Sequence, residues 1–216
     1  ALGGDHSTAY PVARELLRAR EAQGERLAVV QSDAHTDLLD TRLGIEHCFA
    51  TWSFHINEAL GRDGRLVQVG IRDFGKGEVD YAKSQTVNGS PRVVTHFDAD
   101  WSRKLDEGVL FGALVKEAID ALPQHVYVSF DIDGLDPSLC PHTGTPVPGG
   151  LSFNRAAMIL HALATSGRTI IGFDLSEVAP NLADPNDEWD ANVGARVLYK
   201  LCALTLASQG LCKLRE

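Results

Sequence analysis

The chain alternates between short, continuous apolar runs and longer segments in which apolar residues recur every three to four positions. The short runs are rich in β-branched residues, which is typical of buried strands. They lie at residues 27–30, 66–71, 92–97, 126–130 and 169–173. The longer segments have the helical period. They lie at residues 8–21, 109–122, 154–164 and 191–206. This alternation predicts βαβ crossovers and an α/β fold of three layers, α/β/α, with a mostly parallel, doubly wound sheet.

Glycine and proline mark where these elements end. Pro123 directly follows one predicted helix, and Asn88-Gly89 predicts a tight turn. The Pro/Gly-rich residues 137–150 follow a strand and are expected to form a long loop rather than a linker. Residues 2–7 look like the end of a strand whose beginning is missing. Because no repeat or low-complexity tract divides the chain, we expect one domain over residues 1–216, incomplete at its N-terminus.

Composition narrows the possible functions. The 216 residues carry a net charge of −9, which argues against nucleic-acid binding because no basic surface would offset the phosphate charge. No apolar run approaches the roughly 18 residues that span a bilayer, so we expect no membrane segment. Four scattered cysteines without a CxxC pair indicate reduced thiols and a cytoplasmic protein.

Acidic and histidine side chains gather where three predicted strands end. One group follows the strand at 27–30 with i, i+2, i+4 spacing, which would point all three side chains to one side if the segment stays extended. A second group follows the strand at 126–130, and a single histidine follows the opening segment. The residues are His6, Asp33, His35, Asp37, Asp131 and Asp133. Because ligands of open α/β sheets bind at the carboxyl ends of strands, these groups could converge on one pocket.

Four carboxylates in one crevice need positive charge, because burial would otherwise favour their protonation. Each motif alone could be a helix cap, a solvated turn or a ribose-binding aspartate. Three such clusters at strand ends are hard to explain structurally, since an unpaired buried carboxylate costs several kcal/mol. Carboxylate and imidazole ligands without thiolate suit Mn²⁺, Fe²⁺ or Zn²⁺. A pair of such ions would lower the pKa of a bridging water towards neutrality.

The same residues carry a family resemblance. Residues 3–7 (Gly-Gly-Asp-His-Ser), 32–37 (Ser-Asp-Ala-His-Thr-Asp) and 129–137 (Ser-Phe-Asp-Ile-Asp-Gly-Leu-Asp-Pro) resemble the three metal motifs of the ureohydrolase family. That family contains arginase, agmatinase, guanidinobutyrase and formimidoylglutamase. The match continues through residues 143–146 and 172–178. It implies an arginase-like fold, with further sheet elements before the first motif.

The resemblance implies two Mn²⁺ ions per chain. One ion would bind His6, Asp33, Asp37 and Asp131. The other would bind His35, Asp33, Asp131 and Asp133, so that Asp33 and Asp131 bridge. A hydroxide between the ions would attack the guanidinium carbon of a linear guanidine and release urea and an amine.

Three further residues take family roles by position. Glu177 matches the acid that pairs with the guanidinium group, as a planar fork of donors favours. Thr145 lies in a matching stretch and would contact substrate. His47 stands where the family has a histidine proton shuttle, and a near-neutral pKa suits protonation of the departing amine. An ordinary surface histidine is the alternative for His47.

The resemblance leaves the substrate open. Arginases carry Ser-Gly-Asn-x-His-Gly where this chain has residues 42–48, without the Ser-Gly-Asn, and Arg-Asp-Val-Asp where it has residues 72–75. Both differences disfavour arginine and favour agmatine, which would yield putrescine and urea. At position 48 this chain has Cys48, where arginases and agmatinases usually have glycine. Formimidoylglutamase activity, with Arg42 as its cation, arginase or guanidinobutyrase activity, and a non-catalytic member are the alternatives. Family members form trimers or hexamers, so a homo-oligomer is expected.

Overall fold

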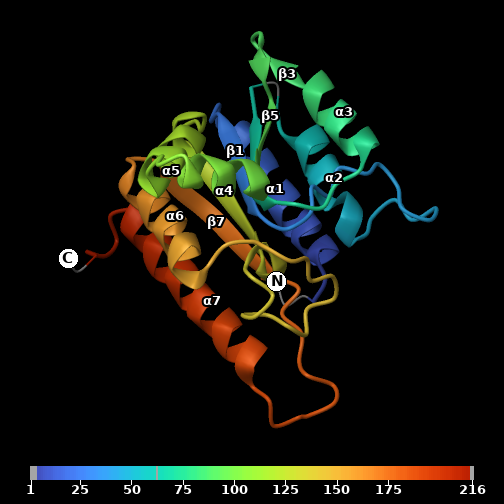
Figure 1. Cartoon of the computed structure of the whole chain (residues 1–216). Coiled ribbons are helices and arrows are strands. Elements are labelled where there is room, and N and C mark those ends of the chain that lie inside the picture. Colours follow the sequence, from blue (N-terminus) through green and yellow to red (C-terminus); the bar gives the residue numbers. More distant parts are fainter. Residues whose placement is uncertain (1–3, 62, 215–216) are drawn as a thin grey trace.

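A five-stranded parallel sheet runs through the centre of the molecule (Figure 1). The computed structural model describes residues 4–61 and 63–214. In spatial order the strands are β5 (Val93–Phe97), β2 (Arg65–Ile71), β1 (Leu27–Ser32), β6 (His125–Asp131) and β7 (Thr169–Ser176). The chain builds from β1 towards β5 and then returns to the other side of β1 with β6. The strand order therefore reverses between β1 and β6, which is where open α/β sheets bind their ligands.

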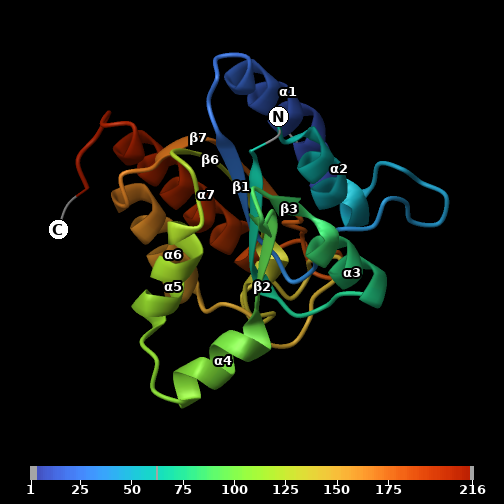
Figure 2. The same cartoon turned by 90° about the horizontal axis from the view of Figure 1, so that it is seen from above.

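Helices cover both faces of the sheet, which confirms the three-layer α/β/α expectation (Figure 2). On one face lie α1 (Ala9–Glu21), α2 (Trp52–Ala59) and α3 (Lys76–Ser84). On the other lie α4 (Asp98–Asp106), α5 (Phe111–Asp120), α6 (Phe153–Thr165) and α7 (Trp189–Ser208). Among the residues that the structure describes, no helix combines the length and the apolar character needed to cross a bilayer.

The continuous apolar runs have a simple cause. In β1, Leu27 and Val29 belong to the core beneath α1 and α2, whereas Ala28 and Val30 belong to the core beneath α5, α6 and α7. Because successive strand side chains point to opposite faces and both faces are covered, both sets must be apolar.

All five predicted strands and all four predicted helices are present, within two or three residues of their expected ends. The strand end expected at residues 2–7 falls partly outside the described residues, and the described part is wrong: Gly4 and Asp5 form a bend, and His6–Thr8 form a 3-10 helix that the Asp5 side chain caps. Three short helices, α2, α3 and α4, were not predicted, and neither was the hairpin of β3 (Thr86–Val87) and β4 (Ser90–Pro91). The turn expected at its tip is confirmed: Asn88 and Gly89 have φ of 51° and 73°, as a type I′ turn requires. The long loop at residues 137–150 is also confirmed.

Candidate metal centre

Two neighbouring strands deliver most of the ligand candidates. β1 ends at Ser32, which is paired with Phe130, and β6 ends one residue later at Asp131. Asp33 and Asp131 therefore leave the sheet side by side. The Asp131 side chain then accepts a hydrogen bond from the Asp133 backbone N at 2.8 Å, which caps a short 3-10 turn.

The segment after β1 bends instead of staying extended. Asp33 Oδ1 accepts a hydrogen bond from the His35 backbone N at 2.7 Å, and Asp37 has a left-handed backbone with φ of 52°. The expectation that the segment stays extended, which the i, i+2, i+4 prediction required, was therefore wrong. The Asp33 side chain takes the His35 N–H that a strand would use for its ladder. The bend itself brings the three side chains towards the same centre.

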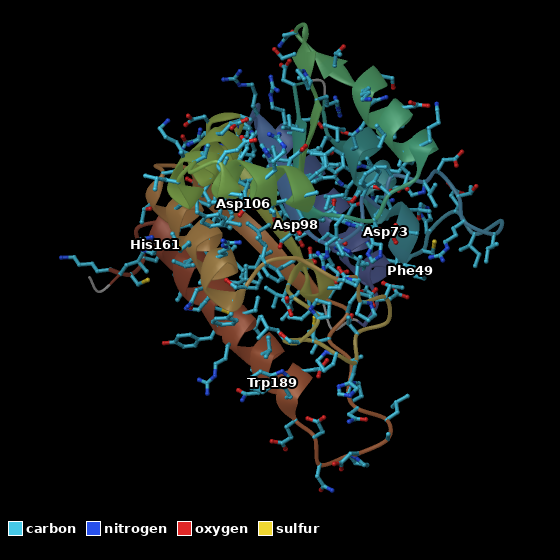
Figure 3. The ribbon with its side chains drawn as sticks, in the orientation of Figure 1. Phe49, Asp73, Asp98, Asp106, His161 and Trp189 are labelled. Atoms are coloured by element: carbon cyan, nitrogen blue, oxygen red, sulfur yellow. The ribbon has the colours of Figure 1, made fainter. Side chains whose placement is uncertain are left out.

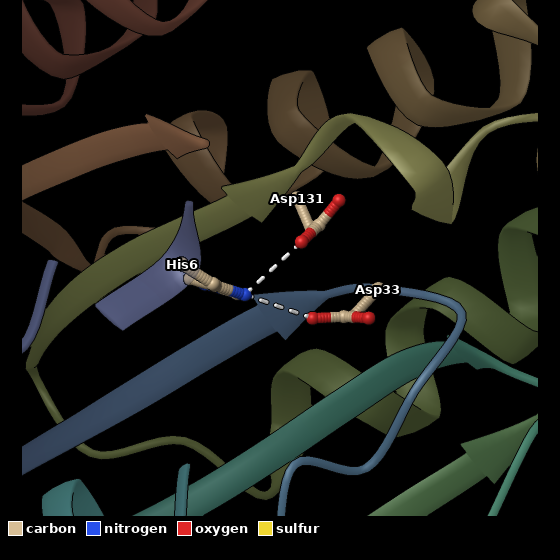
Figure 4. A group of neighbouring side chains, drawn as sticks. All are labelled: His6, Asp33 and Asp131. Carbon is tan, nitrogen blue, oxygen red and sulfur yellow. Dashed lines mark ion pairs between the residues drawn. The ribbon is translucent and has the colours of Figure 1, made fainter. Parts of the chain in front are cut away.

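The first group of candidate ligands surrounds His6 (Figure 4). Its Nδ1 lies 3.1 Å from Asp33 Oδ2 and 3.1 Å from Asp131 Oδ2. Asp37 Oδ2 lies 3.4 Å from the same nitrogen. All four side chains are buried. The His6 nitrogen and the three carboxylate oxygens are close enough together to act as ligands of one divalent cation.

The second group surrounds His35. Its Nδ1 lies 3.1 Å from Asp133 Oδ2 and 3.5 Å from Asp33 Oδ1. Asp33 thus directs one carboxylate oxygen to each group, so that two cations could share it. The structure brings all six predicted ligands together. Asp131 belongs to the first group only, whereas the family resemblance also implied it in the second.

The orientation of the His6 ring has an identifiable cause. His6 Nε2 lies 2.7 Å from Ser129 Oγ, and this hydroxyl donates its proton to Asp174 Oδ1 at 2.9 Å. Ser129 must then accept from His6, which fixes the ring proton on Nε2. Nδ1 is left to face the carboxylates. This is the arrangement by which an outer partner sets the tautomer of a metal-ligating histidine.

Burial and the charge of neighbouring acids disfavour the ionised form of most carboxylates in the cluster. Burial, reinforced by the charge of Asp33, raises the pKa of Asp37 to about 8 and raises the pKa of Asp131 well above its usual range. Burial also opposes ionisation of Asp33, but the close approach of the His35 and His6 rings outweighs it and lowers the pKa of Asp33. The protein therefore holds one acid of the cluster ionised at the cost of its neighbours.

The neighbouring carboxylates also raise the pKa values of both imidazoles. Burial disfavours the charged form of His35, but hydrogen bonds to Asp133 and Asp33 outweigh it and raise the pKa of His35 to about 11. His6 Nδ1 is fully buried and makes no hydrogen bond among the described residues. A buried nitrogen without a hydrogen bond that faces three carboxylates fits a bound cation, and the donor set suits Mn²⁺, Fe²⁺ or Zn²⁺.

A cavity of about 570 Å³ opens beside the centre, with His35 and Asp37 in its wall. Glu78 also lines it, but its carboxylate is occupied by the Thr36 hydroxyl and by the backbone N–H groups of Leu38 and Gly75. Two other charged residues line the cavity, Arg42 and Asp73. The rest of the wall is mainly apolar, formed by Leu39, Phe49, Ala50, Phe74, Pro146 and Val147. Phe49 and Asp73 are labelled in Figure 3.

Glu177 lies directly after β7 in a strained conformation. Its φ is 64°, which is unfavourable for a residue with a side chain. Glu177 Oε1 accepts from the His6 backbone N at 2.8 Å, so the acid is tied to the first ligand group. Burial raises the pKa of Glu177. Thr145 lines the cavity, and its hydroxyl lies 3.4 Å from Asp133 Oδ2.

His47 is not among the residues that line the cavity. It is exposed, stacks on Tyr10 at 5.1 Å between ring centroids, and meets His55 edge-on at 4.3 Å. Its shuttle role stays a prediction.

The residues that support the ligands were not predicted from the sequence. Gln31 donates to Asp33 Oδ2 at 2.8 Å and accepts from Ser53 and Gln68 at 2.6 and 2.7 Å. Arg72 donates to the backbone oxygens of Gly70, Asp133, Leu135 and Val147, which joins β2, the second ligand group and the cavity wall. A polar residue inside a buried strand, as at Gln31 and Gln68, was the available signal.

Comparisons with known proteins agree on one family. Residues 1–203 match the model of the Arginase family. An agmatinase of Neisseria gonorrhoeae is 38% identical over 182 residues, and an N(1)-aminopropylagmatine ureohydrolase of Thermus thermophilus is 35% identical over the same length. Both alignments cover 84% of this chain. The solved structure of proclavaminate amidino hydrolase from Streptomyces clavuligerus superposes with a TM-score of 0.74 at 29% identity, covering 95% of this chain and 64% of that one. The chain spans 52% and 55% of the two curated relatives, which is about half their length.

Proposed function

Because the chain belongs to the arginase family, we propose that it hydrolyses a linear guanidine to urea and an amine, with agmatine as the leading substrate and putrescine as the amine. The observation that carries the proposal is the pair of ligand groups that share Asp33 beside an open cavity. The relatives named agmatinase and N(1)-aminopropylagmatine ureohydrolase support the choice of substrate.

The proposed cofactor is Mn²⁺, one ion in each ligand group. Asp33, which faces both groups, would be a ligand of both ions, and the family resemblance implies the same role for Asp131. When bound, the two cations supply a hydroxide nucleophile at neutral pH and stabilise the negative charge that develops in the transition state. Ser129 and Gln31 hold His6 and Asp33 in place for this task.

The protein side chains then position the guanidinium group. Glu177 Oε1 is held by the His6 N–H, while Oε2 has no hydrogen bond among the described residues. That oxygen faces Gly144, whose missing side chain leaves room beside it, and could accept an N–H of the substrate. In the proposal Thr145 contacts the substrate in the cavity wall, and His47 would deliver the proton to the leaving amine.

Two charged residues of the cavity wall, Arg42 and Asp73, favour different candidate substrates. Arg42 lies over the Phe49 ring at 4.7 Å and forms no ion pair with the described residues. A free cation on the wall favours a substrate whose far end is a carboxylate, such as guanidinobutyrate or formimidoylglutamate. Asp73 instead suits the amine of agmatine, since its side chain is 64% exposed and its nearest charged partner, His35 Nε2, is 3.8 Å away.

Urea release by the Mn²⁺-loaded protein tests the proposal, with agmatine, arginine and guanidinobutyrate as substrates and formamide release from formimidoylglutamate in parallel. We expect urea from agmatine, and an Asp73→Asn variant with a raised KM for agmatine alone. Preference for guanidinobutyrate that Arg42→Gln abolishes would establish the second candidate. No product from any substrate would overturn the proposed activity.

We also propose a domain organisation, a compartment and an oligomeric state for the enzyme. We take residues 1–216 as a single ureohydrolase-like catalytic domain of a cytoplasmic protein that assembles as a trimer or hexamer. The four cysteines are all free in the structure, which agrees with a reducing compartment.

A further inference from the structure

A buried carboxylate at the start of α7 accepts hydrogen bonds from a single histidine with both of its oxygens. Asp190 is only 3% exposed, and its two oxygens accept from the His142 backbone N and from His142 Nδ1, each at 2.9 Å. Among the described residues, His142 is the one ion-pair partner of Asp190. A buried acid needs such partners, and here both belong to a residue of the long loop at 137–150.

The same turn of α7 holds this loop at a second point. Trp189, the first residue of α7 and labelled in Figure 3, donates from Nε1 to the Ser138 backbone O at 3.0 Å. The first two residues of the helix therefore fasten the loop at positions four residues apart. A rigid helix is a firmer support than the loop itself.

The other side of the loop reaches the candidate site. Thr143, next to His142, is buried and donates from Oγ1 to the Glu177 backbone O at 2.9 Å. The Glu177 backbone N in turn donates to the Gly4 O at 2.9 Å. The strained backbone of Glu177 is thus held from both sides, and one of the two supports stands one residue from His142.

We infer that Asp190 and His142 are a positioning pair that fixes the loop at 143–147 and, through Thr143, the conformation of Glu177. The pair acts on the site through the loop and does not touch the reacting atoms. The His142 side chain is 28% exposed, and its backbone N–H still bonds Asp190 when the side chain is replaced, so the fold should tolerate the replacement. The catalytic part of this inference rests on the proposed function, whereas the structural part does not.

Hydrogen–deuterium exchange tests the structural part directly. In His142→Ala, the segments at 142–147 and 175–178 should exchange about tenfold faster, the equivalent of one lost hydrogen bond. His142→Asn keeps an N–H donor near the position of Nδ1 and should restore slow exchange. His161→Ala is the matched control, because His161 is exposed on α6. Unchanged exchange in His142→Ala would overturn the inference.

Steady-state kinetics tests the catalytic part. With agmatine, His142→Ala should lower kcat/KM about tenfold, chiefly through KM, while the metal content stays at the wild-type level. Recovery in His142→Asn supports positioning, whereas equal losses in both variants would mean that the imidazole itself acts and would overturn the inference. If the wild-type protein releases no urea, the proposed function fails, and the exchange data still decide whether the pair positions the loop.

Discussion

Asp33 is the residue on which both ligand groups depend. Its two oxygens face His6 and His35 separately, so a single substitution should disturb both cation sites. We expect Asp33→Asn to lower the bound manganese of the dialysed protein from two ions to fewer than one per chain, measured by elemental analysis. Asp73→Asn, on an exposed side chain of the same cavity, should keep both ions. Two retained ions in Asp33→Asn would contradict the shared-ligand arrangement.

At this scale the sequence was informative about ligands and silent about their supports. The ligands could be found because five of them, Asp33, His35, Asp37, Asp131 and Asp133, stand at or just after the ends of β1 and β6, and because their chemistry together with His6 is unusual. Ser129 and Asp174 could not be connected to His6, because that link depends on the register between β6 and β7. His47 shows the converse: a matching position in a motif does not determine where a side chain packs.

The elements that were missed are those whose stability comes from tertiary packing. α2 is eight residues long, too short to be stable alone, and its burial against α1 through Trp52 and Ile56 holds it in place. α4 begins directly after β5 with Asp98, so its polar first turn hides the change from strand to helix. Strands and long helices were predictable because their apolar periods extend over more residues.

The β3–β4 hairpin permits a stability prediction that is independent of function. Gly89 has φ of 73° at its tip, where an added Cβ meets open space, so the cost of a side chain would be backbone strain alone. We expect Gly89→Ala to lower the free energy of unfolding by about 1 kcal/mol, measured by urea denaturation. Gly112→Ala, also in open space but on helix α5, should leave stability unchanged or raise it. A neutral Gly89→Ala would mean that the turn relaxes to another type.

Most of the buried acids of the molecule gather where the strand order of the sheet reverses, between β1 and β6. Segments far apart in sequence meet there: the loop after β1, the turn after β6 and the opening segment with His6. Because the neighbouring strands and helices bury these acids, their mutual repulsion acts on the junction of the two halves of the sheet. Cation binding should therefore stabilise the fold as a whole.

Removal of the metal tests this coupling. Chelation should lower the free energy of unfolding by about 3 kcal/mol for each bound ion, about 5 kcal/mol for two, relative to protein with free Mn²⁺ at about 100 times its Kd, because a ligand of the folded state alone stabilises by mass action. Thermal denaturation with and without chelator measures the difference, and added Mn²⁺ should reverse it. Asp33→Asn, which we expect to bind less than one ion, should respond weakly to both treatments. Equal stability of chelated and loaded wild-type protein would show that the cluster does not couple cation binding to folding.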